Sequence, residues 1–130
     1  MRKAVLLSIF LAGCNATAGM PPPNAEPAPS SEIIKQAVRA HVRASFFDPY
    51  SVRDAQLSQA TWQGALQLGS GEGWTVCLRA NAKNRMGGYT GLRDTAMTIR
   101  GGKVVTTLDH AQYFCREATY FPFPDLTPGQ

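Results

Sequence analysis

Residues 73–80 read Gly-Trp-Thr-Val-Cys-Leu-Arg-Ala, and residues 94–108 read Asp-Thr-Ala-Met-Thr-Ile-Arg-Gly-Gly-Lys-Val-Val-Thr-Thr-Leu. Both stretches alternate between apolar and polar side chains, which is the period-two pattern of a half-buried β-strand. The adjacent Gly101 and Gly102 can both take positive φ, as the central residues of a tight hairpin must. We therefore expect an antiparallel sheet with a strand at residues 74–80 and a hairpin at residues 94–108.

Upstream of the strand, residues 31–47 have the spacing of one amphipathic helix. Ser30 or Ser31 can cap it, and Pro49 ends it by forcing Asp48 out of helical geometry. The side that we expect to face the core holds Ile33, Ile34, Ala37, Val38, His41, Val42, Ala44 and Ser45. The fold class predicted for residues 31–130 is a single small α+β domain, in which this N-terminal helix packs on an antiparallel sheet of about four strands.

The remaining segments have weaker patterns. Residues 52–58 predict a strand, and residues 61–73 predict a short strand followed by a loose turn. Residues 108–118 fit helical spacing, although a strand is also compatible with them. Residues 120–124 contain two prolines, which exclude a regular helix or an inner strand. We expect the C-terminal segment that contains Cys115 and the aromatic residues of 120–124 to act as a clasp on the domain.

The first residues predict an exported protein. Residues 1–13 combine a basic start with a short apolar run, which is typical of a signal peptide. Residues 11–14, Leu-Ala-Gly-Cys, resemble a bacterial lipobox. That resemblance implies cleavage before Cys14 and its modification with acyl chains such as palmitate, whereas the alternative is an ordinary signal peptide with a chance cysteine. By the same resemblance Asn15, where an aspartate would favour the inner membrane, implies anchoring in the outer membrane, facing the periplasm.

Residues 14–30 are expected to be a linker, because they hold five of the nine prolines and have no apolar face to bury. In extended polyproline geometry, at about 3.1 Å per residue, this linker reaches up to roughly 50 Å from the bilayer. We expect it to act only as a tether.

The charge and the motif content exclude several function classes. The chain has 13 basic and 9 acidic residues, and removal of Arg2 and Lys3 would leave 13 − 2 = 11 basic residues, too near balance to imply a nucleic acid partner. No nucleophile elbow, zinc-protease motif or cofactor motif is present. We therefore expect no enzyme activity and no cofactor. A remote alternative is a small hydrolase or metal protein around His41 and His110, although His41 also fits a hydrogen-bonded core histidine.

Cys77 and Cys115 are the cysteines that remain once Cys14 is assigned to lipid. An even number of cysteines in an oxidising compartment favours a disulfide between them, and two buried free thiols are the alternative. A metal site that adds His41 and His110 lacks the close paired spacing of structural zinc motifs.

The segment of residues 81–91 has the most unusual composition in the chain. Its candidate binding residues are Asn81, Lys83, Asn84, Arg85, Gly87, Gly88, Tyr89 and Gly91. One interpretation is an anion-binding nest of backbone amides and cations. The other is a braced connection between strands, in which Gly88 and Gly91 take conformations that other residues reach only at a cost. We expect no metal in this segment.

Several short motifs then support a resemblance. Asp48-Pro49-x-Ser51, Val76-Cys77, the Asn-Ala-Lys-Asn of residues 81–84 and the Gly-Gly-Tyr-Thr-Gly of residues 87–91 are similar to a group of short exported proteobacterial proteins of unknown function. The resemblance implies a shared small domain and supplies no activity. Leu78 departs from it, since many of those proteins have glycine there.

These observations predict a non-catalytic module for binding or assembly in the cell envelope, with an envelope protein as its partner and with the membrane contacted through Cys14. The basic loop or the aromatic C-terminal segment is expected to form the partner surface. The alternative function is binding of an anionic envelope ligand, lipopolysaccharide or peptidoglycan, through Lys83 and Arg85.

Overall fold

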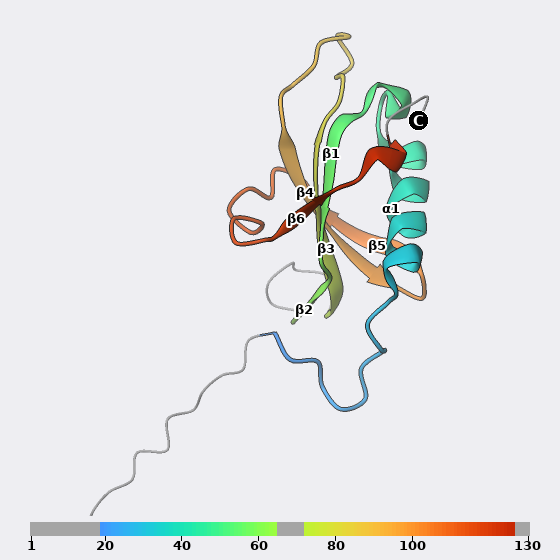
Figure 1. The fold of residues 1–130 in the computed structure, drawn as a ribbon, viewed down its shortest axis with the longest axis vertical. Coiled ribbons are helices and arrows are strands. Elements are labelled where there is room, and N and C mark those ends of the chain that lie inside the picture. The colour runs from blue at the N-terminus through green and yellow to red at the C-terminus, as the bar shows by residue number, and fades with distance from the viewer. Residues whose placement is uncertain (1–18, 65–71, 127–130) are drawn as a thin grey trace, which may run out of the picture.

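The fold comes from a computed structural model that describes residues 19–64 and 72–126 of the 130-residue chain (Figure 1). Its elements are α1 (Ser31–Ser45), the one-turn helix η1 (Pro49–Ser51), β1 (Arg53–Ser58), β2 (Thr61–Gln63), β3 (Gly73–Asn81), β4 (Arg93–Arg100), β5 (Lys103–Leu108), β6 (Tyr120–Pro122) and the one-turn helix η2 (Pro124–Leu126). The α+β class is confirmed. The sheet is larger than expected, with six strands rather than about four. The helix starts at Ser31, where the sequence placed it, so it is the first element of the domain but does not lie at the chain's N-terminus.

The strands form one antiparallel sheet in the order β5-β4-β3-β1-β6, with β2 also pairing β3. The sheet is larger than the sequence predicted because β6 adds to the edge of β1; β1 and β2 correspond to the two separate strands expected in residues 52–58 and 61–73. Both of them lie along the same edge of β3, one after the other. At the break between them, the Ser58 hydroxyl accepts the Cys77 amide N–H at 2.8 Å and donates to the Gln59 carbonyl at 2.9 Å.

Helix α1 covers one face of the sheet (Figure 1). The Ser30 hydroxyl accepts the Ile33 amide N–H at 3.3 Å, which caps the helix as expected. The helix ends at Ser45, two residues earlier than predicted, because Phe46 already has extended geometry. Four side chains are buried against the sheet: Ile34, Ala37, Val38 and Val42. Ile33, Ala44 and Ser45 are exposed and His41 is half-buried, so the buried stripe is narrower than predicted.

The predicted alternation along β3 is confirmed. Val76, Leu78 and Ala80 belong to the large core beneath α1, whereas Cys77 belongs to a small second core on the opposite face. The hairpin between β4 and β5 is also confirmed, with φ of +55° at Gly101 and +72° at Gly102. No helix in the described ranges is long and apolar enough to cross a membrane.

The clasp, residues 109–119, covers that opposite face. It is a series of turns rather than the helix that the spacing of residues 108–118 suggested. Cys115 forms a disulfide with Cys77, and the Ala111 amide N–H donates to the Asp94 carbonyl at 2.8 Å. The chain then pairs with the sheet edge as β6 and buries Phe123. A disulfide therefore clasps the C-terminal segment to the central strand, as predicted.

The last part of the linker is docked on the domain. The carbonyl of Glu26 accepts the Trp74 indole N–H at 2.8 Å, and the Glu26 carboxylate accepts the Gly101 amide N–H at 3.2 Å. Trp74 also packs edge-on against Trp62, with ring centroids 5.5 Å apart. The expectation of a simple tether through residue 30 is therefore wrong, because the chain is fixed to the domain from Glu26 onward.

Candidate functional site

The loop of residues 82–92 between β3 and β4 rises at the end of the molecule away from the linker (Figure 1). Its turn is organised by Asn84, whose side-chain oxygen accepts the amide N–H groups of Met86 at 2.9 Å and Gly88 at 3.2 Å. The Asn84 backbone also donates to the Gly88 carbonyl at 2.9 Å and accepts from Gly87 at 3.0 Å. Gly87 has φ of +78°, which suits glycine.

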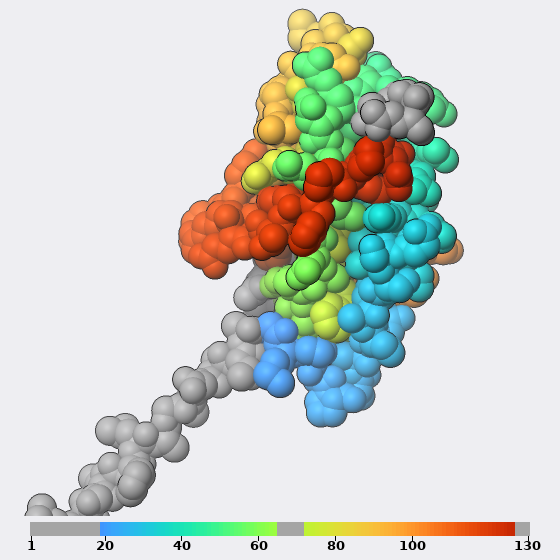
Figure 2. All heavy atoms as spheres, viewed as in Figure 1, coloured from blue at the N-terminus to red at the C-terminus, as the bar shows by residue number. Residues whose placement is uncertain are grey.

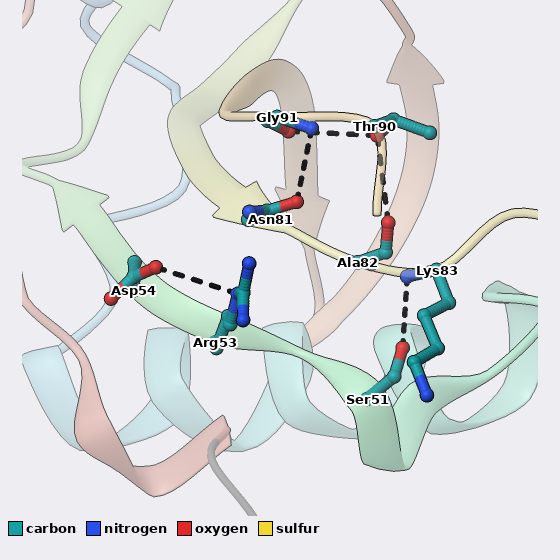
Figure 3. A network of polar contacts seen from close by, with 8 residues as sticks. All are labelled: Ser51, Arg53, Asp54, Asn81, Ala82, Lys83, Thr90 and Gly91. Atoms are coloured by element: carbon teal, nitrogen blue, oxygen red, sulfur yellow. Dashed lines mark hydrogen bonds and ion pairs between the residues drawn. The ribbon is translucent and has the colours of Figure 1, made fainter. Parts of the chain in front are cut away.

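The base of the loop is fixed by three further contacts (Figure 3). The Asn81 side-chain oxygen accepts the Gly91 amide N–H at 3.1 Å, and the Thr90 amide N–H donates to the Ala82 carbonyl at 3.3 Å. The Lys83 amide N–H donates to the Ser51 hydroxyl at 2.9 Å, which ties the loop to η1.

These bonds bear directly on the anion-nest interpretation. A nest needs several neighbouring amide N–H groups that point at the ligand. Here seven amides of the segment donate to acceptors within the domain, those of Lys83, Asn84, Met86, Gly87, Gly88, Thr90 and Gly91. The geometry therefore favours the braced connection, and any anion would have to be bound by side chains.

Gly88 and Gly91, both expected to need a backbone conformation that favours glycine, differ in their φ angles. Gly91 has φ of +83°, in the left-handed region, so this prediction is confirmed. Gly88 has no positive φ, and a Cβ there would come no closer than 3.9 Å to its nearest neighbour. The prediction for Gly88 is wrong, since Gly87 takes the left-handed position in the turn instead.

The side chains of the loop carry the cations and aromatic rings. The Arg53 guanidinium lies 3.6 Å from the centre of the Tyr89 ring, and the Lys83 ammonium lies 5.5 Å from the same ring. The Arg85 guanidinium lies 5.8 Å from the ring of Phe47. Such contacts hold a cation over the negative face of a ring while leaving it open to solvent.

A β-bulge places Arg53 over this ring. Arg53 pairs with Asn81 and Gln56 pairs with Arg79, so two residues of β1 oppose a single residue of β3. Asp54, inside the bulge, has φ of +54°, a left-handed conformation that aspartate tolerates better than most residues. Bulges redirect side chains at strand ends, and this one turns Arg53 toward Tyr89. The ion pair between Arg53 and Asp54, at 3.8 Å and exposed, adds little.

We call the combined region the tip surface. It consists of Phe47, Tyr50, Arg53, Lys83, Arg85, Met86 and Tyr89. Figure 2 shows that the yellow loop and the adjoining green segment after α1 gather at one end of the molecule. Its large apolar side chains are unusually exposed, at 94% for Met86, 72% for Tyr50 and 62% for Phe47. Several such residues gathered with cations form a surface suited to binding.

The histidines considered for catalysis or metal binding lie apart from the tip surface. His41 lies on α1, where burial lowers its pKa and the negative charge of Asp109 partly opposes this. The His41 ring nitrogen Nδ1 is 3.4 Å from the Ser45 hydroxyl. His110 lies after β5 and contacts Arg93. Because Cys77 and Cys115 are bonded to each other, the site that combines them with both histidines is excluded. Within residues 19–64 and 72–126, no cluster of His, Cys, Asp and Glu could hold a metal ion.

Sequence reasoning missed the part of the tip surface that lies outside the loop. Phe47, Tyr50 and Arg53 flank the Asp48-Pro49 turn, which was interpreted only as a helix stop. One signal was present: Ser51 belongs to the Asp48-Pro49-x-Ser51 motif, and the structure shows its hydroxyl bonded to the loop.

The comparisons with known proteins found no match: no family model, curated protein or solved structure is similar to the chain.

Proposed function

We propose that this protein is a non-catalytic, lipid-anchored module of the outer membrane that faces the periplasm and binds an envelope protein through the tip surface. The observation that carries the proposal is the construction of the loop. Its backbone groups are satisfied within the domain, while Met86, Tyr50 and Phe47 remain exposed. A rigid backbone with protruding aromatic and cationic side chains lowers the entropy that is lost on binding.

The composition of the tip surface favours a protein partner. Tyrosine, arginine, phenylalanine and methionine are the residue types enriched in protein interfaces, and tyrosine and arginine are common among their hot spots. The tip surface contains each of these types. Its cations Arg53, Lys83 and Arg85 indicate that the partner's complementary surface is acidic.

The position of the linker supports the same function. The docked linker leaves the domain at the end opposite the loop, along the longest axis of the molecule (Figure 1). The 11 residues between Cys14 and Glu26 include a turn in which the Ala25 amide N–H donates to the Pro22 carbonyl at 2.9 Å, so their reach is less than the roughly 34 Å of fully extended geometry. A chain anchored at Cys14 would therefore present the tip surface away from its own membrane.

A test of the partner surface compares two double variants in cross-linked envelopes. Arg85→Ala with Met86→Ser removes an exposed cation and an exposed apolar side chain from the tip surface. Lys103→Ala with Val105→Ser makes the same kind of change on β5, where Val105 is 49% exposed. We expect the tip variant to lose the cross-linked partner and the β5 variant to keep it. Equal recovery of the partner with both variants would contradict the proposal.

Anchoring requires its own test. The change Cys14→Ser should leave an uncleaved precursor without acyl label, because the sulfur that receives the lipid is absent. Normal processing and unchanged membrane fractionation of this variant would refute the lipoprotein assignment. Separation of inner and outer membranes would then test the location.

A second candidate function is binding of an anionic envelope ligand, lipopolysaccharide or peptidoglycan. The surplus of Arg53, Lys83 and Arg85 over the neighbouring Asp54 favours it. In this case the isolated protein should bind lipopolysaccharide or peptidoglycan without any protein partner, and the affinity should fall steeply between low and physiological salt. Binding that survives Lys83→Ala with Arg85→Ala would exclude this candidate.

A further inference from the structure

A cavity of about 160 Å³ lies between the end of α1 and the sheet, separate from the tip surface. Its floor is apolar and is formed by Leu78, Ala80 and Ala82 with the ring of Phe46. Leu78 is 1% exposed, so the floor is part of the domain interior. The cavity is comparable in volume to an engineered protein cavity that binds benzene, and it is therefore large enough for a small branched side chain.

The mouth of the cavity is polar and carries both signs of charge. Arg93, Asp109 and His110 line it and are exposed, while Thr95 lies buried beneath them. The Thr95 hydroxyl donates to one carboxylate oxygen of Asp109 at 3.3 Å. This leaves the second carboxylate oxygen of Asp109 able to accept from a ligand.

Arg93 supplies the opposite charge beside His110. Arg93 donates from Nη1 to the His110 ring nitrogen Nδ1 at 2.8 Å, and arginine has further N–H groups that can bind a carboxylate. His110 has φ of +57°, a left-handed conformation that is unfavourable for a non-glycine residue. Such backbone strain is concentrated at binding and catalytic sites. Here it belongs to the turn that brings Asp109 and His110 to the cavity mouth.

These groups together select among small ligands. An anion with an apolar group would pair with Arg93 but would be repelled by the negative charge of Asp109. A cation would pair with Asp109 but would be repelled by the positive charge of Arg93. A zwitterion satisfies both, provided that it also has an apolar group for the floor. We propose that this cavity binds a free α-amino acid with a small apolar side chain, its ammonium on Asp109 and its carboxylate on Arg93.

The test uses the full chain and three probes of similar shape: leucine, isocaproate, which lacks the ammonium group, and isoamylamine, which lacks the carboxylate. Binding is followed through the NMR amide signals of Ala80, Ala82 and Thr95. We expect leucine to shift these signals in a saturable way, with a dissociation constant on the order of 1 mM. Each of the other probes should bind about tenfold more weakly, because one charged hydrogen bond is lost.

Two variants assign the charges. Asp109→Asn retains an acceptor for Thr95 and should remove the preference for leucine over isocaproate. Arg93→Gln should remove the preference for leucine over isoamylamine. Arg116→Gln makes the same change as Arg93→Gln at an exposed arginine of the clasp, outside the cavity, and should leave both preferences intact. The melting temperature of each variant shows whether it is folded.

The outcomes decide the proposal without reference to the tip surface. The proposal is supported if folded Asp109→Asn loses only the preference for leucine over isocaproate, and folded Arg93→Gln loses only the preference for leucine over isoamylamine. No shift with leucine in the unaltered protein would overturn it, and so would equal binding of all three probes. Preferences that persist in both folded cavity variants would also overturn it, because the charges at the mouth would then play no part.

Discussion

The clasp and the tip loop are irregular segments of similar length, and they use their residues in opposite ways. The clasp is attached through two inward side chains, since Cys115 bonds to Cys77 and Ala111 is buried, while Tyr113 is 79% exposed. The tip loop satisfies its backbone through Asn81 and Asn84 and turns its larger side chains outward. A segment held through its side chains covers a core, whereas a segment held through its backbone leaves its side chains available for a partner.

The face beneath the clasp needs such side-chain links because it has little apolar area. Its buried cluster consists of Cys77, Ala96, Ala111 and Cys115. Beside this cluster, Arg79 donates to both carboxylate oxygens of Asp94, at 2.7 and 2.9 Å, and these bonds raise the pKa of Arg79. Arg79 also lies 4.2 Å from the centre of the Tyr120 ring, and burial raises the pKa of Tyr120 to about 12. A covalent bond and an ion pair thus supplement the small hydrophobic contribution on this face.

The largest expected effect is on the clasp. Replacing both Cys77 and Cys115 by alanine opens a disulfide with a sequence separation of 38 residues. The chain-entropy model then predicts a loss of about 4 kcal/mol in the free energy of unfolding. Denaturant titration measures this loss, and hydrogen exchange should show residues 111–118 losing protection while α1 keeps its own. Uniform loss of protection would mean that the clasp is not a separable unit.

A smaller effect is expected from the ion pair. Asp94 is 2% exposed, so Asp94→Ala removes a buried partner of Arg79 and should cost about 2 kcal/mol. A double-mutant cycle with Arg79→Met isolates the interaction between the two side chains. If the stability losses of the two single variants add up to that of the double variant, the ion pair does not stabilise the face beneath the clasp. The disulfide would then be the only link that distinguishes the clasp from the tip loop.

Within the tip loop, Gly91 and Gly88 form a matched pair. Gly91→Ala places a side chain at φ of +83° and should lower the stability by about 1–2 kcal/mol. Gly88→Ala has space for its Cβ and no left-handed φ, so its melting temperature should change little. Equal melting temperatures for the two variants would show that backbone geometry does not brace this loop.

The smallest effect is expected at Asn84. Asn84→Ala removes the acceptor of two exposed hydrogen bonds and should cost about 1 kcal/mol. Asn84→Asp retains the acceptor oxygen and serves as the control, with near-normal unfolding in denaturant. Were the two substitutions to destabilise equally, the side-chain oxygen would not be what organises the turn.

Much of the fold was predictable because local patterns encode it. The alternation through Val76 and Leu78, the glycine pair at the hairpin and the cap at Ser30 are short-range signals, and each is confirmed. The short strand β2 was indicated within residues 61–73. The number of strands was not predictable, since β6 is three residues long and depends on pairing with a distant partner. A three-residue segment is too short to show a period.

The candidate site was predictable only in part for the same reason. Asn81 and Asn84 could be recognised as backbone partners from their residue type, and Gly91 from its conformational freedom. The approach of Arg53 to Tyr89 depends on a bulge, and the mouth of the cavity joins β4 to the turn after β5. These are tertiary relations between residues that no spacing in the chain brings together.

The length and position of β3 have a mechanical consequence. Trp74 near its start holds the docked linker, and Asn81 at its end holds the tip loop. A pull between a membrane anchor and a partner on the tip surface would therefore run along this strand. Antiparallel hydrogen bonds lie perpendicular to the strand direction. The bonds of β3 to β4 on one side, and to β1 and β2 on the other, would therefore all be sheared at the same time by such a pull. Under the proposed function, this geometry would resist tension between the docked linker and the tip loop better than it would resist peeling of a sheet edge.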